Sequence, residues 1–211
     1  MNPIGVDSKM KRTLGIFLSG AVLVVSSPLS LVIAVLVKLD SKGPVFFIQD
    51  RVGKDGKPFR AYKFRTMLHG AADQGAGLII EGQDDPRITK VGKFLRRWSL
   101  DELPQFINIL KDEMSVVGPR PTLPYQVQQY DEFQRRRLEV KPGITGWAQI
   151  HGRNVLSWPE RIEYDVWYVD NWSFRLDMEI ILKTFGVLFK REGLYGDKER
   201  FIIRPQDEKR R

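Results

Sequence analysis

Residues 14–37 read LGIFLSGAVLVVSSPLSLVIAVLV, a run of 24 residues without a single charge. A helix of this length would be about 36 Å long at about 1.5 Å per residue, which is enough to cross a bilayer. Ser27-Pro28 interrupts the run, because proline lacks a backbone donor and clashes with the preceding turn. The run therefore predicts a membrane segment that is broken near its middle.

Basic residues flank this run on both sides, at Lys9, Lys11, Arg12, Lys38 and Lys42. Positive charge favours the cytoplasmic face of a membrane, so both ends are expected on that face. A helix–break–helix that enters one leaflet and turns back satisfies both the flanks and the break. A single-span anchor with a proline kink is the alternative, and the residues favour the two about equally. A cleaved signal peptide fits less well, because its apolar region is only about 7–15 residues long.

The composition narrows the class of protein. With 211 residues, the chain is expected to form one compact domain plus an appendage. Its net charge of +8 suits nucleic acid, an anionic membrane or a phosphorylated substrate. The absence of cysteine excludes disulfides and thiolate metal sites, and it fits a reducing compartment. His69 and His151 are far apart in sequence, which argues against a histidine-rich metal site.

A β-hairpin is predicted directly after the apolar run. Residues 45–51 and 58–65 have the composition of strands, and Asp55-Gly56 between them is a strong hairpin signal. Side chains alternate along a strand, so Lys63 and Arg65 should share one face. Two cations on one face could hold an anion, although a solvated face is the commoner outcome.

Helices are expected over residues 90–97, 103–110, 123–140, 159–171 and 176–190. The last two are amphipathic. Arg135-Arg136-Arg137, within the third, is interpreted as a solvated or membrane-facing cluster. Residues 70–86 are rich in glycine and acidic side chains and predict a loop, as do the polar residues 149–154.

The segment Ser99-Leu100-Asp101-Glu102-Leu103-Pro104-Gln105 has two structural interpretations. Ser99 and Glu102 match a capping box, which would place Pro104 inside the helix, where it would remove a hydrogen bond. A cap at Asp101 instead places Pro104 in the first turn, where its missing donor has no consequence. The second placement is favoured, and it puts Asp101 at the positive end of a helix dipole.

The same segment also suggests chemistry. An ionised carboxylate in a dry, cationic pocket can act as a nucleophile. Glu102 would repel Asp101 unless a divalent cation neutralised the pair, and Mg²⁺ suits an all-oxygen site with phosphate substrates. The sharper hypothesis is therefore attack of Asp101 on phosphorus, while the residues alone favour a plain helix cap.

Arg120 strengthens the phosphate hypothesis. Pro119 and Pro121 restrict the backbone on both sides, and an ordered guanidinium is a good bidentate phosphate clamp. Arg96 lies five residues before Asp101. With Lys63 and Arg65, these arginines could line an anion-binding pocket, and the alternative is a set of unrelated surface cations.

With these residues in place, the chain resembles the small monotopic phosphoglycosyl transferases, bacterial sugar-phosphate transferases that begin lipid-linked glycan assembly. The resemblance runs from about Met10 to Gly196, and the order and number of its motifs argue against chance. The matching segments are Ser27-Pro28, Gly43-Pro44-Val45-Phe46, Arg51-Val52-Gly53, Lys63-Phe64-Arg65-Thr66-Met67, Ser99-Leu100-Asp101-Glu102-Leu103-Pro104-Gln105, Val117-Gly118-Pro119-Arg120-Pro121 and Lys141-Pro142-Gly143-Ile144-Thr145-Gly146.

The resemblance implies an α+β, mainly helical fold with a re-entrant membrane helix broken at Ser27-Pro28, a small β-hairpin and interfacial amphipathic helices. Residues 1–40 would form the membrane helix with its basic flanks, and residues 41–211 the cytoplasmic catalytic domain. The protein would be monotopic in the bacterial inner membrane, facing the cytoplasm. Its partners would be membrane phospholipid and its substrates, with no nucleic acid, and it could form a homodimer.

The resemblance also implies a reaction. Asp101 would attack the β-phosphate of a UDP-sugar, release UMP and form a covalent phosphosugar ester. Polyprenyl phosphate, in particular undecaprenyl phosphate, would then take up the sugar phosphate. Mg²⁺ would be held by Glu102 and Asp101. Phosphates would be bound by Lys63, Arg65, Arg96 and Arg120, with Gln149 and Arg153 as further substrate-binding candidates.

Three other classes of function remain open at the level of sequence. A membrane-tethered nucleic-acid or lipid-binding module would use the net charge and the aromatic residues, but no nucleic-acid-binding motif occurs and the acidic residues are interspersed. A hydrolase would keep the carboxylate nucleophile and make water the acceptor. A purely structural membrane adaptor would tolerate Asp101→Asn.

Overall fold

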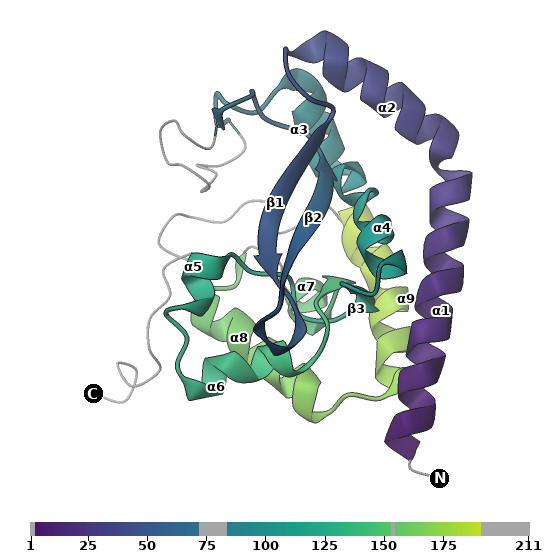
Figure 1. The fold of residues 1–211 in the computed structure, drawn as a ribbon, viewed down its shortest axis with the longest axis vertical. Coiled ribbons are helices and arrows are strands. Elements are labelled where there is room, and N and C mark those ends of the chain that lie inside the picture. Colours follow the sequence, from purple (N-terminus) through teal and green to yellow (C-terminus); the bar gives the residue numbers. More distant parts are fainter. Residues whose placement is uncertain (1–2, 72–83, 153–154, 191–211) are drawn as a thin grey trace.

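The computed structural model describes residues 3–71, 84–152 and 155–190. Figure 1 shows a long helix along one side of a smaller, mixed α and β part that is built around a hairpin. The elements in the first half are α1 (Pro3–Val25), α2 (Ser27–Asp40), β1 (Phe46–Val52), η1 (Lys54–Gly56), β2 (Pro58–Phe64), α3 (Lys90–Arg97), η3 (Leu100–Glu102) and α4 (Gln105–Leu110). Those in the second half are β3 (Ser115–Val117), α5 (Pro124–Val127), α6 (Glu132–Arg135), η4 (Arg136–Glu139), β4 (Gly143–Thr145), α7 (Trp147–His151), α8 (Trp158–Asp170) and α9 (Phe174–Lys190).

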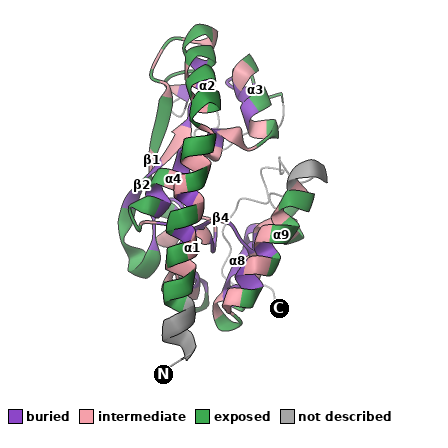
Figure 2. Ribbon diagram, turned by 90° about the vertical axis from the view of Figure 1, so that its right-hand side faces the viewer, coloured by how far each residue is buried: buried purple, intermediate pink, exposed green. Residues whose placement is uncertain are grey.

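The apolar run forms two helices with a bend between them. No single helix in the described ranges is long and apolar enough to cross a membrane, whereas Ser8–Val25 and Ser27–Asp40 satisfy that test as a pair bent by 60°. The break falls where Ser27-Pro28 predicts it, since Pro28 lies in the first turn of α2, where no backbone donor is needed. The outer faces of α1 and α2 are exposed (Figure 2), including Val24 and Val25.

Both ends of this helix pair are bonded to the rest of the molecule. Near the start, the Arg12 guanidinium donates to the backbone carbonyls of Ile109 and Leu110 at the end of α4. At the other end, Arg65 donates to carbonyl oxygens at the end of α2, including those of Val37 and Ser41. The pair therefore leaves the body and returns to it.

The hairpin agrees with its prediction. Asp55 and Gly56 both have positive φ, 56° and 76°, as a tight hairpin turn requires. The strands are antiparallel, and their register places Phe47 opposite Lys63. Phe64 lies on the other face, where it packs against Ile33 of α2 and Leu95 of α3. The face that carries Lys63 is thereby directed toward the remaining elements.

Two short parallel strands, β3 and β4, place the Pro119-Arg120-Pro121 segment. Ser115 pairs with Gly143 and Val117 with Thr145. The residue after β3 lies very close to the segment before β4. A Cβ atom on Gly118 would lie 2.3 Å from the carbonyl oxygen of Lys141. Only glycine allows this approach, so Gly118 fixes the direction in which the Arg120 segment leaves the strand.

The expected helix over residues 123–140 is wrong, because the structure divides it into α5, α6 and η4. The division has a local cause. Asp131 accepts a hydrogen bond from the backbone of Gln134 at 2.8 Å, and Gln134 accepts one from the backbone of Asp131 at 3.3 Å. This capping box starts a new helix in the middle of the predicted one.

The interpretation of the arginine triplet also needs correction. Arg137 is only 2% exposed, and its guanidinium is ion-paired with Asp165 of α8. Its neighbour Arg136 remains partly exposed and pairs with Glu139 and Asp170. The triplet is therefore not a single solvated or membrane-facing cluster.

The C-terminal helices are confirmed within a few residues as α8 and α9. The predicted polar loop over residues 149–154 is partly wrong, because α7 extends to His151. Most of the predicted loop over residues 70–86 lies outside the described residues, and so does Arg153.

Candidate active site

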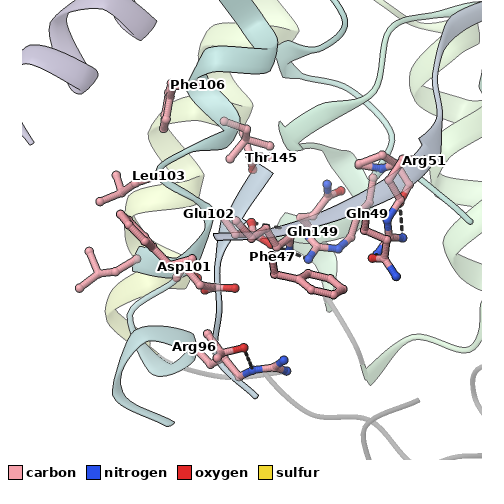
Figure 3. A pocket seen from close by; sticks show the side chains of 18 of the residues that line it. Phe47, Gln49, Arg51, Arg96, Asp101, Glu102, Leu103, Phe106, Thr145 and Gln149 are labelled. Atoms are coloured by element: carbon pink, nitrogen blue, oxygen red, sulfur yellow. Dashed lines mark hydrogen bonds and ion pairs between the residues drawn. The ribbon is translucent and has the colours of Figure 1, made fainter. Parts of the chain in front are cut away.

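A cavity of about 1100 Å³ lies between the hairpin, the segments after α3 and β3, and helices α1, α7, α8 and α9. Figure 3 shows that Asp101 and Glu102 lie in the middle of its labelled side chains, with Arg96 on one side of them and Arg51 farther along the cavity. Arg51 lies 50 residues before Asp101 in the sequence, so the fold brings these two parts of the cavity together.

The turn that carries the two carboxylates is not a helix cap in either of the predicted placements. Ser99 makes no side-chain capping hydrogen bond, and α4 begins only at Gln105, with Pro104 before it. Ser99 has left-handed backbone angles, φ 55° and ψ 22°, which cost a residue other than glycine about 1–2 kcal/mol. This strained residue starts the η3 turn that places Asp101 and Glu102 in the cavity.

Glu102 is held firmly by two cations. Its Oε1 atom lies 2.6 Å from Lys63 Nζ of β2 and 2.6 Å from Arg120 Nη2. The Glu102 side chain is only 13% exposed. Burial raises the pKa of Glu102, but Arg120 and Lys63 together outweigh this effect and hold that pKa well below its usual range. Glu102 is therefore a fixed, ionised carboxylate.

Asp101 is buried like Glu102, but it differs in its partners and in the direction of its pKa shift. It is 8% exposed, and within the described residues its carboxylate has no hydrogen-bond or ion-pair partner. Figure 3 shows the carboxylate directed into the cavity. Burial raises its pKa, Lys63 opposes this change, and the charge of Glu102 adds to it. The site thus holds one carboxylate that is fixed in ion pairs, Glu102, beside one that is poorly solvated and has no direct partner, Asp101.

The predicted cations take different positions around this pair. Arg96 donates from Nε to Thr66 Oγ1 at 2.8 Å, which fixes it to the segment after β2. That contact depends on Gly92, because a Cβ atom there would lie 2.1 Å from the Thr66 carbonyl oxygen. Arg120 is positioned through its backbone, whose carbonyl accepts a hydrogen bond from Arg137 at 3.0 Å. With Lys63, these arginines line the cavity as predicted.

Arg65 does not join the anion-binding set. Its Nε donates to Pro44, and its two Nη atoms donate to Ser41, Lys42 and Val37. These five hydrogen bonds use every guanidinium donor, and four of them go to backbone carbonyls in and after the last turn of α2. The structure therefore assigns Arg65 to holding the helix pair, and it leaves no donor for a phosphate. Gln149 lines the cavity as predicted.

Gln49 and Arg51 were not among the predicted site residues, although both line the cavity. Arg51 donates from Nη2 to Gln49 Oε1 at 2.5 Å and from Nη1 to the Pro121 carbonyl at 3.0 Å. The sequence contains a signal for their place in the site. Strand alternation puts Phe47, Gln49 and Arg51 on one face, and the hairpin register puts Lys63 on the same face.

The carboxylates fit Mg²⁺ only in a limited way. Within the described residues, no group of three or more histidine, cysteine, aspartate or glutamate side chains could hold a metal ion. Mg²⁺ commonly binds one or two carboxylates and completes its shell with water and substrate phosphates. Asp101 and Glu102 fit that pattern, in which the metal would arrive with a diphosphate substrate.

Comparison with known proteins gives consistent matches. A family profile described as bacterial sugar transferase matches residues 6–191. The sugar transferase EpsL of Bacillus subtilis is 52% identical over 159 residues, which are 75% of this chain and 77% of EpsL. The exopolysaccharide production protein ExoY of Sinorhizobium fredii is 38% identical over 208 residues, which are 92% of this chain and 91% of ExoY.

A longer relative carries a more specific name. The UDP-glucose:undecaprenyl-phosphate glucose-1-phosphate transferase of Escherichia coli is 44% identical over 200 residues. The match covers 90% of this chain but only 42% of that enzyme, so the chain spans less than half of this relative.

Proposed function

The chain belongs to the bacterial sugar transferase family, and from this we propose that it transfers a sugar 1-phosphate from a UDP-sugar to polyprenyl phosphate, with release of UMP. Undecaprenyl phosphate is the proposed acceptor, and the reaction would be the first membrane step of lipid-linked glycan synthesis, such as that of exopolysaccharide, capsule, O-antigen or glycoprotein glycan. The observation that supports this most directly is the contrast between two adjacent carboxylates. That of Asp101 is buried in the cavity without a direct partner, whereas that of Glu102 is fixed by Lys63 and Arg120.

In the first step, an oxygen of Asp101 attacks the β-phosphorus of the UDP-sugar. A bond forms between this oxygen and phosphorus, and the bond from phosphorus to the bridging oxygen breaks. The bridging oxygen leaves on the α-phosphate, so UMP departs and the sugar phosphate stays on Asp101. Lys63, Arg96 and Arg120 would stabilise the charge that moves onto the leaving phosphate.

In the second step, a phosphate oxygen of the polyprenyl phosphate attacks the same phosphorus. The bond to Asp101 breaks, the carboxylate is regenerated, and the product is a polyprenyl diphosphate sugar. Both nucleophiles, the carboxylate and the lipid phosphate, carry their own negative charge. Neither step therefore needs a general base, which agrees with a site whose neighbouring carboxylate is fixed in ion pairs.

We propose Mg²⁺ as the cofactor, with Glu102 and Asp101 as its protein ligands. When bound, the ion would neutralise charge on the diphosphate of the donor. Lys63 and Arg120 would also hold Glu102 in place, and burial keeps Asp101 poorly solvated.

The helix pair supports a position at the cytoplasmic face of the inner membrane. α1 and α2 expose apolar side chains at their bend, and both ends of the pair are bonded to the same body. A segment that crossed the bilayer would carry one of these ends away from the body. We therefore propose a re-entrant, monotopic arrangement, with the cavity beside the membrane, where a soluble nucleotide sugar and a lipid phosphate can both reach it.

The test is UMP release by the detergent-solubilised protein over a panel of UDP-sugars, with Mg²⁺ or EDTA and with or without undecaprenyl phosphate. We expect release with one or a few sugars, dependent on Mg²⁺ and stimulated by the lipid. Intact-protein mass spectrometry without lipid should show an added sugar phosphate, which Asp101→Asn abolishes. Substantial UMP release by folded Asp101→Asn would exclude the covalent mechanism, and free sugar phosphate formed without lipid would indicate a hydrolase.

A further inference from the structure

We propose that the hydrocarbon chain of the acceptor lies in an apolar channel that forms the α1–α9 side of the cavity and leads from the membrane to Asp101. This inference rests on the proposed function, because it assigns a place to that reaction's lipid substrate. The wall of the channel is formed by Leu18 and Val22 of α1, Leu103 and Phe106 beyond the η3 turn, and Ile181 and Phe185 of α9.

The cavity has two chemically different ends, and they lie in different directions from Asp101. In Figure 3, Leu103 and Phe106 lie above Asp101, whereas Gln49 and Arg51 lie to its right. A nucleotide sugar is polar throughout, so it suits the end with Gln49 and Arg51. A polyprenyl phosphate has a charged head on a hydrocarbon chain, so it suits an apolar end that terminates at cations. The two substrates must meet the same phosphorus, and this arrangement lets each approach it from its own end.

The charges along the cavity support the same division. Within the described residues, neither α1 nor α9 contributes a charged side chain to the lining, although both helices carry charged residues elsewhere. The charged lining residues come from the hairpin and its following residue, α3, η3, the segment after β3, η4 and α8. A charged ligand would thus find no charged partner between α1 and α9, whereas a hydrocarbon chain needs none.

The channel also connects with the surface that we place at the membrane. Phe185 lines the cavity and is 58% exposed, so it marks an opening. Phe17 and Leu182, neighbours of the lining residues Leu18 and Ile181, are exposed on the same two helices. Figure 2 shows α1 and α9 on either side of the β4 region, with exposed outer faces. A chain could therefore enter sideways from the bilayer without crossing polar surface.

The gain from such a channel is orientation more than affinity. A hydrocarbon chain that moves from lipid tails to an apolar protein wall gains little hydrophobic free energy, because both surroundings are apolar. The channel would instead hold the phosphate head at the Asp101 ester, which reduces the freedom lost on reaction. Obstruction of the channel should consequently affect the lipid step far more than the nucleotide step.

The experiment compares Leu18→Trp and Val22→Trp with Phe17→Trp. The first two add bulk inside the channel, whereas Phe17 is 72% exposed and does not line the cavity, so it provides the same change on the same helix. The nucleotide step is measured without lipid, as exchange of labelled UMP into the UDP-sugar. The lipid step is measured as transfer to undecaprenyl phosphate and to a short, water-soluble isoprenyl phosphate.

We expect Leu18→Trp and Val22→Trp to lower kcat/KM for undecaprenyl phosphate by about tenfold, which corresponds to about 1.4 kcal/mol, with a much smaller effect on exchange. The short acceptor should be affected less than the long one, and Phe17→Trp should match the parent protein. Equal kcat/KM values in all variants, with exchange intact, would overturn the channel and leave the proposed function standing. A similar fall in Phe17→Trp would overturn it as well, since the cause would then be altered membrane insertion. Absence of exchange in the parent protein would instead contradict the proposed function itself.

Discussion

Asp101 and Glu102 are adjacent in the chain, but their surroundings shift their pKa values in opposite directions. Burial raises the pKa of Asp101, whereas Arg120 and Lys63 outweigh burial and lower the pKa of Glu102. A carboxyl group whose pKa rises on folding destabilises the fold when it is ionised, and one whose pKa falls stabilises it. The residue proposed as the nucleophile should therefore weaken the fold at neutral pH, and its neighbour should strengthen it.

Thermal unfolding can test this contrast. At pH 7 we expect Asp101→Asn to unfold at a higher temperature than the parent protein, because it removes a buried charge without a direct partner. Glu102→Gln should unfold at a lower temperature, because Lys63 and Arg120 lose their ionised partner. The expected loss of stability is about 1–3 kcal/mol. The scan rate must be the same for all variants.

The pH dependence of the same measurement supplies the control. The penalty at Asp101 is complete above its folded pKa and disappears as the pH falls toward the ordinary aspartate value, so the advantage of Asp101→Asn should shrink at lower pH. An advantage that stayed constant between pH 8 and pH 5 would show that its source is not the charge of Asp101.

The donor step should depend on pH through the same group. Asp101 must be ionised to attack phosphorus, so its raised pKa predicts an acidic limb of UMP exchange above the range of an ordinary aspartate. Lys63 is the strongest of the charges that lower this pKa. Lys63→Met should therefore shift the limb to higher pH, in addition to lowering the rate. Lys93→Met, on the exposed surface of α3, is the matched control and should leave the limb in place.

At the scale of elements, the local features of the fold were predictable and the long-range ones were not. The hairpin and α3 follow from turn and helix signals within a few residues, so their bounds were close to correct. The break before α6 also has a local signal, the Asp131–Gln134 capping box, which the prediction overlooked. The burial of Arg137 depends on Asp165, 28 residues away, and no pattern around Arg137 announces it.

The same distinction applies to the candidate site. The carboxylates and all four predicted phosphate-binding cations line one cavity, because each belongs to a short motif with recognisable chemistry. Arg65 differs from the other three because its donors are taken by groups in and after the last turn of α2, and only the tertiary structure brings that helix end to β2. Residue type indicates what a side chain can bind, whereas its neighbours determine what it does bind.

Arg137 offers a prediction at this scale, because it joins η4 to α8 and to the Arg120 backbone. Its guanidinium pairs with Asp165 and donates to Tyr130 at 2.7 Å. Arg137→Met should destabilise the protein by about 3–5 kcal/mol, since it leaves the Asp165 carboxylate buried without a partner. Urea denaturation measures this change in the free energy of unfolding.

A neighbouring residue and a double variant provide the controls for Arg137→Met. Arg136→Met removes the adjacent, partly exposed arginine and should change stability little. Arg137→Met combined with Asp165→Leu should recover much of the loss, because the buried charge is removed from both sides. Equal effects of Arg136→Met and Arg137→Met would contradict the role assigned to the buried pair.

At the scale of the whole molecule, polar contacts at both ends of α1 and α2 close the helix pair onto the body. Arg12 donates to carbonyl groups of α4 and pairs with Asp112, while Arg65 holds the end of α2. The basic residues before the apolar run are interpreted from the sequence only as membrane-topology signals, but Lys11 and Arg12 also attach α1 to the rest of the protein through Asp177 and Asp112. The same side chains would thus serve both the proposed membrane topology and the tertiary structure.

This closure predicts that both ends of the helix pair stay on the cytoplasmic side. The chain has no cysteine, so single cysteines at Ser8 and Lys42, both exposed, can report their own accessibility. A thiol reagent that cannot cross membranes should label neither position in intact cells whose outer membrane is permeabilised, and both positions in inverted inner-membrane vesicles. Labelling of Ser8→Cys in intact cells would mean that α1 crosses the bilayer. In that case the Arg12 and Lys11 contacts could not coexist with the membrane-embedded protein, and the apolar channel would lose its α1 wall.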